Sequence, residues 1–226
     1  MIYVISDLHG YLLEKFQQLL RKAEFGEMDV LYILGDVIDR NNDGGIEMLN
    51  WLRERDNVHL ILGNHEEMML SVLDASGIEK QERLKNYRLS GGEVTLNALE
   101  KLHRRSPESV TAIVAYLRNA SLYQIVTTNN QKYLLLHGGL DNFSRDKRLS
   151  DYTSDEILWA WPEIDDTYYG DVITIFGHTP TVSYGEDYRG KILKTKTWID
   201  IDVGAGLGIE PVLLRLDDMR EFRNDR

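Results

Sequence analysis

Short runs of apolar residues recur along the chain, and each run ends in a cluster of Gly, Asp, Asn or His. The runs are Ile2–Ile5, Val30–Leu34, Val58–Leu62, Tyr133–Leu136, Val172–Phe176 and Trp198–Ile201. Apolar runs of this length, bounded by Gly and charged residues, are typical of strands that are buried on both faces. The pattern therefore predicts six buried strands, each followed by a polar loop.

Two stretches between the first three runs have the spacing of amphipathic helices. Residues 11–24 place five apolar side chains on one face: Leu12, Leu13, Phe16, Leu19 and Leu20. Residues 45–54 predict a second helix. Alternation of strand, polar loop and helix is typical of an α/β fold, in which ligands bind at the carboxyl ends of the strands. The six polar clusters all fall at such ends.

Helical patterns also fill residues 66–118, where no strand-like run occurs. Ser106 and Pro107 predict the start of a helix, with the serine as cap and the proline in the first turn. We expect this region to be a helical insertion beside the sheet, within a single domain that spans residues 1–226.

Composition narrows the class of protein. The chain has 226 residues, a net charge of −11 and no cysteine. Disulfides and thiolate metal sites are therefore excluded, and the acidic balance argues against a broad surface for duplex nucleic acid. No apolar run approaches the length of a membrane span, and the start MIYVISDLHG lacks the features of a signal peptide. We expect a cytoplasmic protein without a membrane segment, and its oligomeric state is not predicted.

The polar clusters contain the side chains of a candidate metal site. They are Asp7, His9, Asp36, Asn64, His137 and His178. Oxygen and imidazole ligands without thiolate suit Mn²⁺, Fe²⁺ or Zn²⁺. Residues two apart at an extended strand end face the same side, so Asp7 and His9 are expected to reach one ion. Two ions need a bridging carboxylate, for which Asp36 is placed after Gly35, and the remaining three residues would hold the second ion.

Each of these residues also has an ordinary structural interpretation. An aspartate after a strand is more often a turn or helix cap, and a lone histidine is more often part of a hydrogen-bonded core. The distribution of histidines favours a metal site over these structural roles, because four of the six lie in the strand-end clusters. We expect the other two, His59 and His103, to be structural.

The motifs DLHG, GDVIDR, GNHE, HGGL and FGHTP, in this order, resemble the calcineurin-like metallophosphoesterases. The closest pattern is the phosphoprotein-phosphatase branch in its short bacterial and lambda-phage type, and LSGGEVTL and IDVGA extend the similarity to about residues 2–206. The resemblance implies a β-sandwich of mixed sheets flanked by helices. It implies the same ligands for two divalent ions, expected to be Mn²⁺ with Fe or Zn as alternatives. Pro180 stands where many relatives have a further histidine, which also favours this branch.

The resemblance implies a phosphatase that hydrolyses phosphate monoesters by direct attack of a hydroxide held by two metal ions. His65 is the expected general acid, Asp39 would orient it, and Arg40 would bind phosphate oxygens. In isolation, Asp39 and Arg40 are better explained by a local surface ion pair, and the register with the motif favours the functional roles. Asp202 is expected to form a loop and is not assigned as a ligand.

One position departs from the pattern. Trp161 stands where lambda-type relatives carry a second phosphate-binding arginine, and it could stack on a base, pack against a substrate or belong to the core. Arg145, Arg148 and Arg189 are candidate substitutes. The leading prediction is a protein serine/threonine phosphatase that acts on a phosphorylated protein or a small phosphoester. A dinucleoside polyphosphate hydrolase is the alternative, and a non-catalytic binding module on the same fold is the third.

Overall fold

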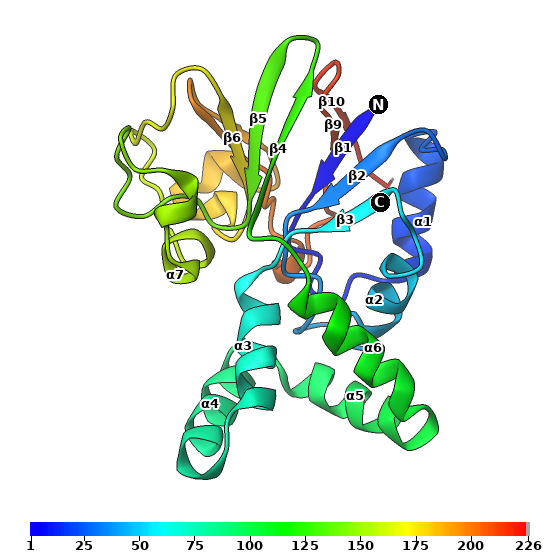
Figure 1. Ribbon diagram of the computed structural model, residues 1–226. Helices are drawn as coiled ribbons and strands as arrows, with labels where there is room; N and C mark the ends of the chain where they lie inside the picture. The colour runs from blue at the N-terminus through cyan, green and yellow to red at the C-terminus, as the bar shows by residue number, and fades with distance from the viewer. Residues whose placement is uncertain (225–226) are drawn as a thin grey trace.

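The computed structural model describes residues 1–224 and contains two five-stranded sheets (Figure 1). The first sheet has the order β10 (Arg220–Phe222), β9 (Leu213–Arg215), β1 (Ile2–Ile5), β2 (Val30–Ile33) and β3 (Val58–Leu60). The second has the order β4 (Tyr123–Thr128), β5 (Gln131–Leu136), β6 (Ile173–Phe176), β8 (Trp198–Asp200) and β7 (Leu193–Lys194).

Both sheets are mixed. In the first, β1, β2 and β3 run parallel, and β9 pairs with β1 in the antiparallel direction. In the second, β5, β6 and β8 run parallel, with β4 and β7 antiparallel at the two edges. The predicted α/β class with two mixed sheets and flanking helices is confirmed, and each of the six predicted strands is present.

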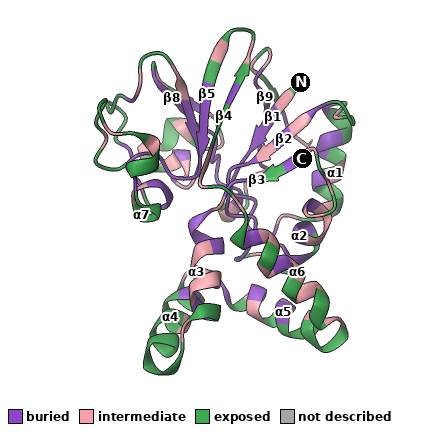
Figure 2. Ribbon diagram, in the orientation of Figure 1, coloured by how far each residue is buried: buried purple, intermediate pink, exposed green. Residues whose placement is uncertain are grey.

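The two sheets share one apolar core. Val4 and Leu34 of the first sheet belong to the same cluster as Val126, Leu135 and Ile175 of the second. Because their outer faces are also covered, the central strands are buried on both sides, as Figure 2 shows. This explains why they consist of continuous apolar runs without polar alternation.

Helices cover the outer face of each sheet. Beside the first sheet lie α1 (Leu13–Lys22) and α2 (Ile46–Leu52), and Phe16 and Leu49 pack into its core. Beside the second lies the short α7 (Ser154–Leu158), whose Ile157 packs with Trp198. The two predicted helices are therefore present, with ends one or two residues inside the predicted ones.

The region 66–118 contains the predicted helical insertion. It is built from α3 (Asn64–Asp74), α4 (Gly77–Leu89), α5 (Glu93–Arg105) and α6 (Pro107–Arg118), which extend from one end of the sheets (Figure 1). Leu117 and Ile113 of α6 and Tyr87 of α4 join the core of the first sheet. The outer turns of α4 and α5 are exposed (Figure 2). No helix within residues 1–224 is long and apolar enough to cross a membrane.

Two local expectations were wrong in their geometry. Asp7 and His9 are not extended, because their φ angles are 53° and 42°. Ser106 precedes α6, and Pro107 is in its first turn as predicted, but the Ser106 hydroxyl bonds the side chains of Glu108 and Ser109 and does not cap the backbone. The apolar runs also did not predict β4, nor the short strands β7, β9 and β10, which have only two or three residues and depend on their partners.

Leu117→Ala should lower the stability of the fold, because this fully buried side chain joins the insertion to the core. Removing a buried leucine costs about 2–5 kcal/mol, which corresponds to a fall in melting temperature of about 4–20 °C for a chain of this size. Thermal unfolding followed by circular dichroism measures it. The control is Leu89→Ala, since Leu89 is 78% exposed, and an equal fall for both would contradict the packing described.

Candidate metal centre

The predicted ligands converge at the carboxyl ends of the strands. Asp7 and His9 follow β1, Asp36 follows β2, and Asn64 opens α3 just after β3. His137 follows β5 and His178 follows β6, so the second sheet supplies both of the last two. All six side chains are buried except that of His178, which is half-buried.

Asp36 lies at the centre of the cluster. Its Oδ2 is 3.6 Å from His9 Nε2 and 3.8 Å from His65 Nε2, and its Oδ1 is 3.4 Å from His137 Nε2. Two groups of possible ligand atoms share this carboxylate: His9, Asp36 and His65 in one, and Asp36, His137 and His178 in the other. A shared carboxylate between two groups is the arrangement that a two-metal site requires.

Backbone carbonyls orient two of the histidines. His9 Nδ1 lies 3.1 Å from Ile38 O, and His137 Nδ1 lies 2.7 Å from Leu34 O. These contacts leave Nε2 of each ring directed at Asp36, as in metal sites where a second partner fixes the imidazole. Burial lowers the pKa of His9 and of His178 to about 3 and also lowers the pKa of His137. The rings are therefore neutral, which is the form that binds metal.

The amide of Asn64 provides a test of whether a cation fits here. Its Oδ1 faces His137 Nε2 at 2.9 Å, His178 Nδ1 at 3.2 Å and both oxygens of Asp36 at 3.1 Å. An amide turned by 180° would donate to His137 Nε2 and to the Asp36 carboxylate, whereas the inward oxygen faces these three acceptor atoms unless a cation lies among them. The donor set at this point fits a divalent ion.

Asp7 adds a second observation of the same kind. Its Oδ2 accepts the backbone N–H of His178 at 2.9 Å, but its Oδ1 is buried and has no hydrogen-bond partner of standard geometry among residues 1–224. Burial, followed by the charges of Asp202 and Asp36, raises the pKa of Asp7. A buried carboxylate with a free oxygen is stabilised by a cation, so the residues present fit two metal ions.

His65 is held between Asp39 and Arg40. Its Nδ1 lies 2.6 Å from Asp39 Oδ2, and its Nε2 lies 3.3 Å from an Arg40 terminal nitrogen. Burial opposes protonation of His65, but the charges of Asp36 and Asp39 outweigh it and raise the pKa of the ring. Asp39 and Arg40 therefore do not form an isolated surface ion pair, since Asp39 is fully buried against His65.

The insertion fixes the second oxygen of Asp39. Tyr87 of α4 donates its hydroxyl to Asp39 Oδ1 at 2.6 Å, and Thr95 of α5 donates to the same oxygen at 2.5 Å. Both donors are buried. The sequence did not point to either residue, although Thr95 lies within the LSGGEVTL motif.

Glu66 is a further residue that the sequence did not reveal. Its carboxylate accepts the backbone N–H groups of Asp36, Val37, Ile38 and Gly63 at 2.8–3.2 Å. Burial and the charge of Asp36 raise the pKa of Glu66 to about 7, against the effect of these N–H groups. This side chain joins the loop after β2 to the start of α3, and the GNHE motif was the signal that could have identified it.

Six of the nine predicted site residues have a positive φ angle: Asp7, His9, Asp36, Asp39, Arg40 and His178. Such conformations cost about 1–3 kcal/mol each and occur where the surrounding contacts enforce them. Gly35 has φ of 86°, and a Cβ there would lie 2.5 Å from Gly63 Cα. Gly63 itself has a negative φ, so it is needed for close approach to Asp36 and not for a left-handed turn.

Trp161 lies at the mouth of the site and not in the core. It is 59% exposed, and its Nε1 donates to His178 Nε2 at 2.9 Å. Trp159 is 40% exposed and its ring lies edge-on to His178, with 5.9 Å between the ring centroids. The candidate substitutes for the missing arginine do not contact the ligands: Arg148 pairs with Asp151 and Arg189 with Glu186, and Arg145 makes no contact with the site residues.

The indole of Trp161 constrains how His178 can bind a metal. An indole N–H only donates, so His178 Nε2 is the acceptor in this arrangement and the proton of the neutral ring is on Nδ1. Nδ1 is the nitrogen that faces Asn64. Ligation through Nδ1 would move the proton to Nε2, and Trp161 would then lose its hydrogen bond.

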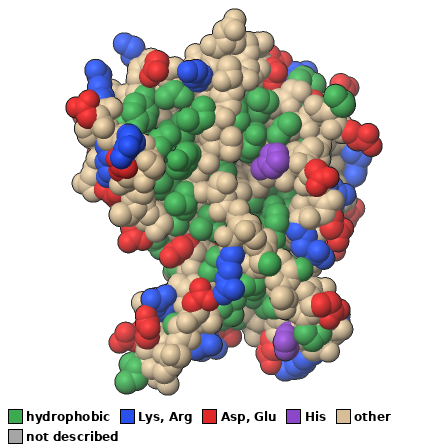
Figure 3. All heavy atoms as spheres, viewed as in Figure 1, with side chains coloured by type: hydrophobic (Ala, Val, Ile, Leu, Met, Phe, Trp, Pro, Cys, Tyr) green, Lys and Arg blue, Asp and Glu red, His purple; other side chains and the backbone are tan. Residues whose placement is uncertain are grey.

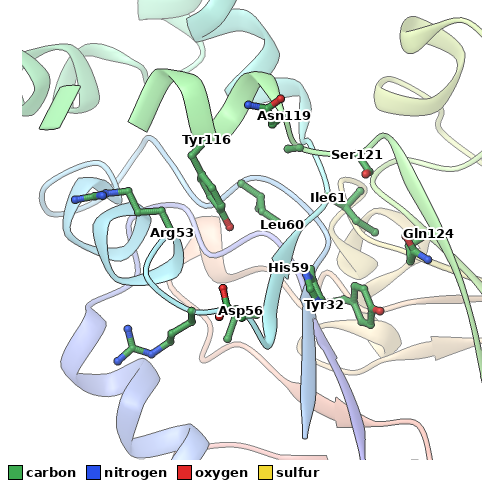
Figure 4. Close-up of a pocket in the computed structure, with 13 residues that line it drawn as sticks. Tyr32, Arg53, Asp56, His59, Leu60, Ile61, Tyr116, Asn119, Ser121 and Gln124 are labelled. Carbon is green, nitrogen blue, oxygen red and sulfur yellow. The ribbon is translucent and has the colours of Figure 1, made fainter. Parts of the chain in front are cut away.

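A cavity of about 630 Å³ lies away from this centre, along the open edge of β3 (Figure 4). Tyr116, Leu60 and Arg53 line one part of it, and Tyr32 and His59 another. The His59 ring packs on Tyr32 with 5.1 Å between centroids, which agrees with a structural role for His59.

Acidic and basic side chains are mixed over the face of the molecule in Figure 3.

The geometry is that of a candidate site for two metal ions, built at the carboxyl ends of the strands. The chain belongs to the calcineurin-like phosphoesterase family, whose model matches residues 1–201. Over 140 residues, or 61% of its length, it is 30% identical to the symmetrical bis(5'-nucleosyl)-tetraphosphatase of Buchnera aphidicola subsp. Acyrthosiphon pisum. The matched part is less than half of the length of such relatives, at 44% of this one.

Solved structures agree with the fold. A structure assigned as a diadenosine tetraphosphatase has a TM-score of 0.62 at 16% identity, over 99% of this chain and 92% of the other. A protein serine/threonine phosphatase of Saccharomyces cerevisiae has a TM-score of 0.60 at 18% identity, over 100% of this chain and 76% of the other. At these identities the likeness concerns the fold alone.

Glu66→Ala should destabilise the protein strongly, because four buried N–H groups would lose their acceptor. Each unsatisfied group costs about 1–3 kcal/mol, so we expect a loss of more than about 3 kcal/mol. Urea denaturation measures it. Glu66→Gln keeps one acceptor oxygen and should lose less, and a loss below about 1 kcal/mol for the alanine variant would show that the loop does not depend on Glu66.

Trp161→Phe should tighten Mn²⁺ binding. It removes the indole N–H that keeps the His178 proton on Nδ1, the nitrogen that would bind the ion. The removed hydrogen bond is worth about 0.5–1.5 kcal/mol, equivalent to an affinity gain of about two- to twelvefold. Calorimetric titration of the metal-free protein measures it. Trp159→Phe is the control, since Trp159 contacts His178 without a hydrogen bond. Unchanged or weaker binding by Trp161→Phe would rule out this competition.

Proposed function

We propose that this protein is a metal-dependent hydrolase of dinucleoside polyphosphates. The observation that carries this proposal is a buried cluster of candidate ligands for two metal ions, with exposed Trp159 and Trp161 beside His178, where the expected second arginine is absent. Indole rings bind bases by stacking, whereas a second arginine would bind phosphate. The similarity to symmetrical bis(5'-nucleosyl)-tetraphosphatases supports the same assignment. The alternative prediction is thus favoured over the protein serine/threonine phosphatase.

The six predicted ligands divide between two ions in this proposal. Asp7 and His9 would hold one ion, Asn64, His137 and His178 would hold the other, and Asp36 would be shared between them. We expect Mn²⁺, with Fe or Zn as alternatives. When bound, such ions neutralise phosphate oxygens and lower the pKa of water to about 7, so that hydroxide is available at neutral pH.

His65 then supplies the proton that the departing phosphate oxygen requires. Its Nδ1 is engaged by Asp39, so Nε2 faces the site and carries the transferable proton when the ring is charged. Arg40 lies within contact of the same Nε2, where its planar guanidinium can bind the phosphate oxygens of the substrate. Tyr87 and Thr95 hold Asp39 in place and so keep the ring oriented.

We also propose that residues 1–226 act as one metallophosphoesterase domain. Support comes from the insertion, since Tyr87 and Thr95 complete the environment of Asp39 and Leu117 packs into the core of the first sheet. An insertion that contributes residues to the environment of Asp39 and to the core of the first sheet is not an independent module.

A substrate panel tests the reaction. With Mn²⁺, we expect kcat/KM for diadenosine tetraphosphate to exceed that for a phosphoserine peptide at least tenfold, with ADP as the sole nucleotide product of symmetrical cleavage. Chelator should abolish turnover. A preference for the phosphopeptide by orders of magnitude would identify a protein phosphatase instead. Absence of chelator-sensitive turnover of every substrate, including p-nitrophenyl phosphate, would favour a binding module.

His65→Ala should lower kcat by about 10²–10⁴ while both ions still bind, because a general acid acts on the proton and not on the metal. The loss should be largest for β-glycerophosphate, whose alkoxide leaving group needs a proton, and smaller for diadenosine tetraphosphate and p-nitrophenyl phosphate, whose leaving groups need little protonation. Asn64→Ala is the matched comparison one residue away and should reduce metal content. Metal analysis alongside kinetics separates the two roles. Loss of a metal ion from His65→Ala would show that His65 is a ligand, as its position in one of the two clusters allows.

A further inference from the structure

A second cavity, of about 310 Å³, lies between the insertion and the chain that follows α7. It is lined by Met68 and Ser71 of α3, by Arg83, Asn86 and Tyr87 of α4, and by Trp159. These elements come from separate parts of the chain, but α7 and the α3–α4 pair lie at the same end of the two sheets (Figure 1). Glu67 and Asp155 also repel each other across this gap, which places α7 close to α3.

Two of the lining residues connect the cavity to the metal centre. Tyr87 forms part of its wall and donates to Asp39, the partner of His65. Trp159 forms another part and lies edge-on to His178. A ligand in the cavity would therefore touch two residues that themselves contact the site, Tyr87 through Asp39 and Trp159 through His178.

The walls have the chemistry of a site for a flat aromatic group. Trp159 is 40% exposed and carries an indole, Met68 adds an apolar side chain, and the buried Tyr87 lies behind them in the wall. Sulfur and aromatic groups make favourable contacts with planar rings. The Asn86 side chain at the rim forms no hydrogen bond within residues 1–224, and its amide can both donate and accept. A nucleobase presents this combination of a flat face and a polar edge.

Arg83 does not make the cavity a phosphate site. Its guanidinium is bound by Glu79 at 2.6 Å and by the Ser71 carbonyl at 3.3 Å, so it is already paired. Phosphoserine and phosphothreonine side chains carry no ring for Trp159 to stack on. The cavity volume lies at the lower end of the range for small-molecule sites, about 300–1,000 Å³, which suits one nucleoside.

We propose that this cavity binds one nucleobase of the substrate while the phosphate chain lies at the metal centre. The inference rests on the proposed function, because it assigns the residues that would recognise a nucleotide. Trp159 is the stacking residue, and Asn86 contacts the edge of the base. Trp161, which donates a hydrogen bond to His178, does not line this cavity.

Binding of ADP and of adenosine to the intact protein tests the site directly. Stacking of a base on an aromatic side chain corresponds to about a 5- to 150-fold change in affinity. Calorimetry in the presence of Mn²⁺ should therefore show ADP affinity reduced by about that factor in Trp159→Ala. Trp159→Phe keeps a ring and should recover most of the affinity. Asn86→Leu should weaken the binding of both ADP and adenosine, whereas Leu89→Ala on the same helix should leave their binding unchanged.

Kinetics provides the second measurement. The ratio of kcat/KM for diadenosine tetraphosphate to that for β-glycerophosphate, which has no base, should fall at least tenfold in Trp159→Ala. An unchanged ratio together with unchanged ADP affinity would overturn the proposal. An equal loss for both substrates would assign Trp159 to the metal centre and not to base recognition, which also overturns it.

Failure of the proposed function would look different. If the wild-type protein hydrolyses β-glycerophosphate but not diadenosine tetraphosphate, the assigned reaction is wrong. ADP and adenosine binding that depends on Trp159 would still support a nucleobase site in that case. If the wild-type protein binds neither ligand, the nucleobase site is wrong whatever the reaction is.

Discussion

The buried carboxylate of Glu66 is the contact on which the metal centre depends. It accepts hydrogen bonds from backbone N–H groups of the loop after β2 and from that of Gly63 after β3. Asp36 is carried by the first of these segments, and Asn64 and His65 by the second. Because Asp36 and several neighbours have strained φ angles, the loops would relax without an acceptor that holds them. One carboxylate thereby fixes the bridging residue, an amide and an imidazole relative to one another.

The sequence predicted six of the ten strands within residues 1–224, because apolar runs are local signals, and its strand-end motifs pointed to candidate ligands that the structure brings together. It was wrong about how Asp7 and His9 converge, since the extended geometry assumed for them is replaced by left-handed turns. It did not reveal Tyr87 and Thr95, which lie 48 and 56 residues from Asp39 and meet it only through the packing of the insertion. No spacing rule relates positions so far apart.

The substrate was the least predictable property, because it depends on the rim of the site and not on its ligands. The motifs are shared by enzymes that act on proteins and on nucleotides, and the folds of both superimpose on this chain. In this chain the rim includes a pair of indoles beside His178. Their positions relative to the ring became clear only in three dimensions, and they favour the nucleotide alternative.

The way in which the insertion is anchored divides it into two zones with different freedom to change. Tyr87 and the first turns of α5 contact Asp39, the partner of the proposed general acid His65. Substitutions there should therefore lower turnover. The outer face of α4 is exposed, and Tyr87 is the one buried residue of that helix. Mutations can accumulate on the outer face without disturbing the chemistry beneath it. Within this family, a new specificity could therefore evolve on α4 while the reaction itself is preserved.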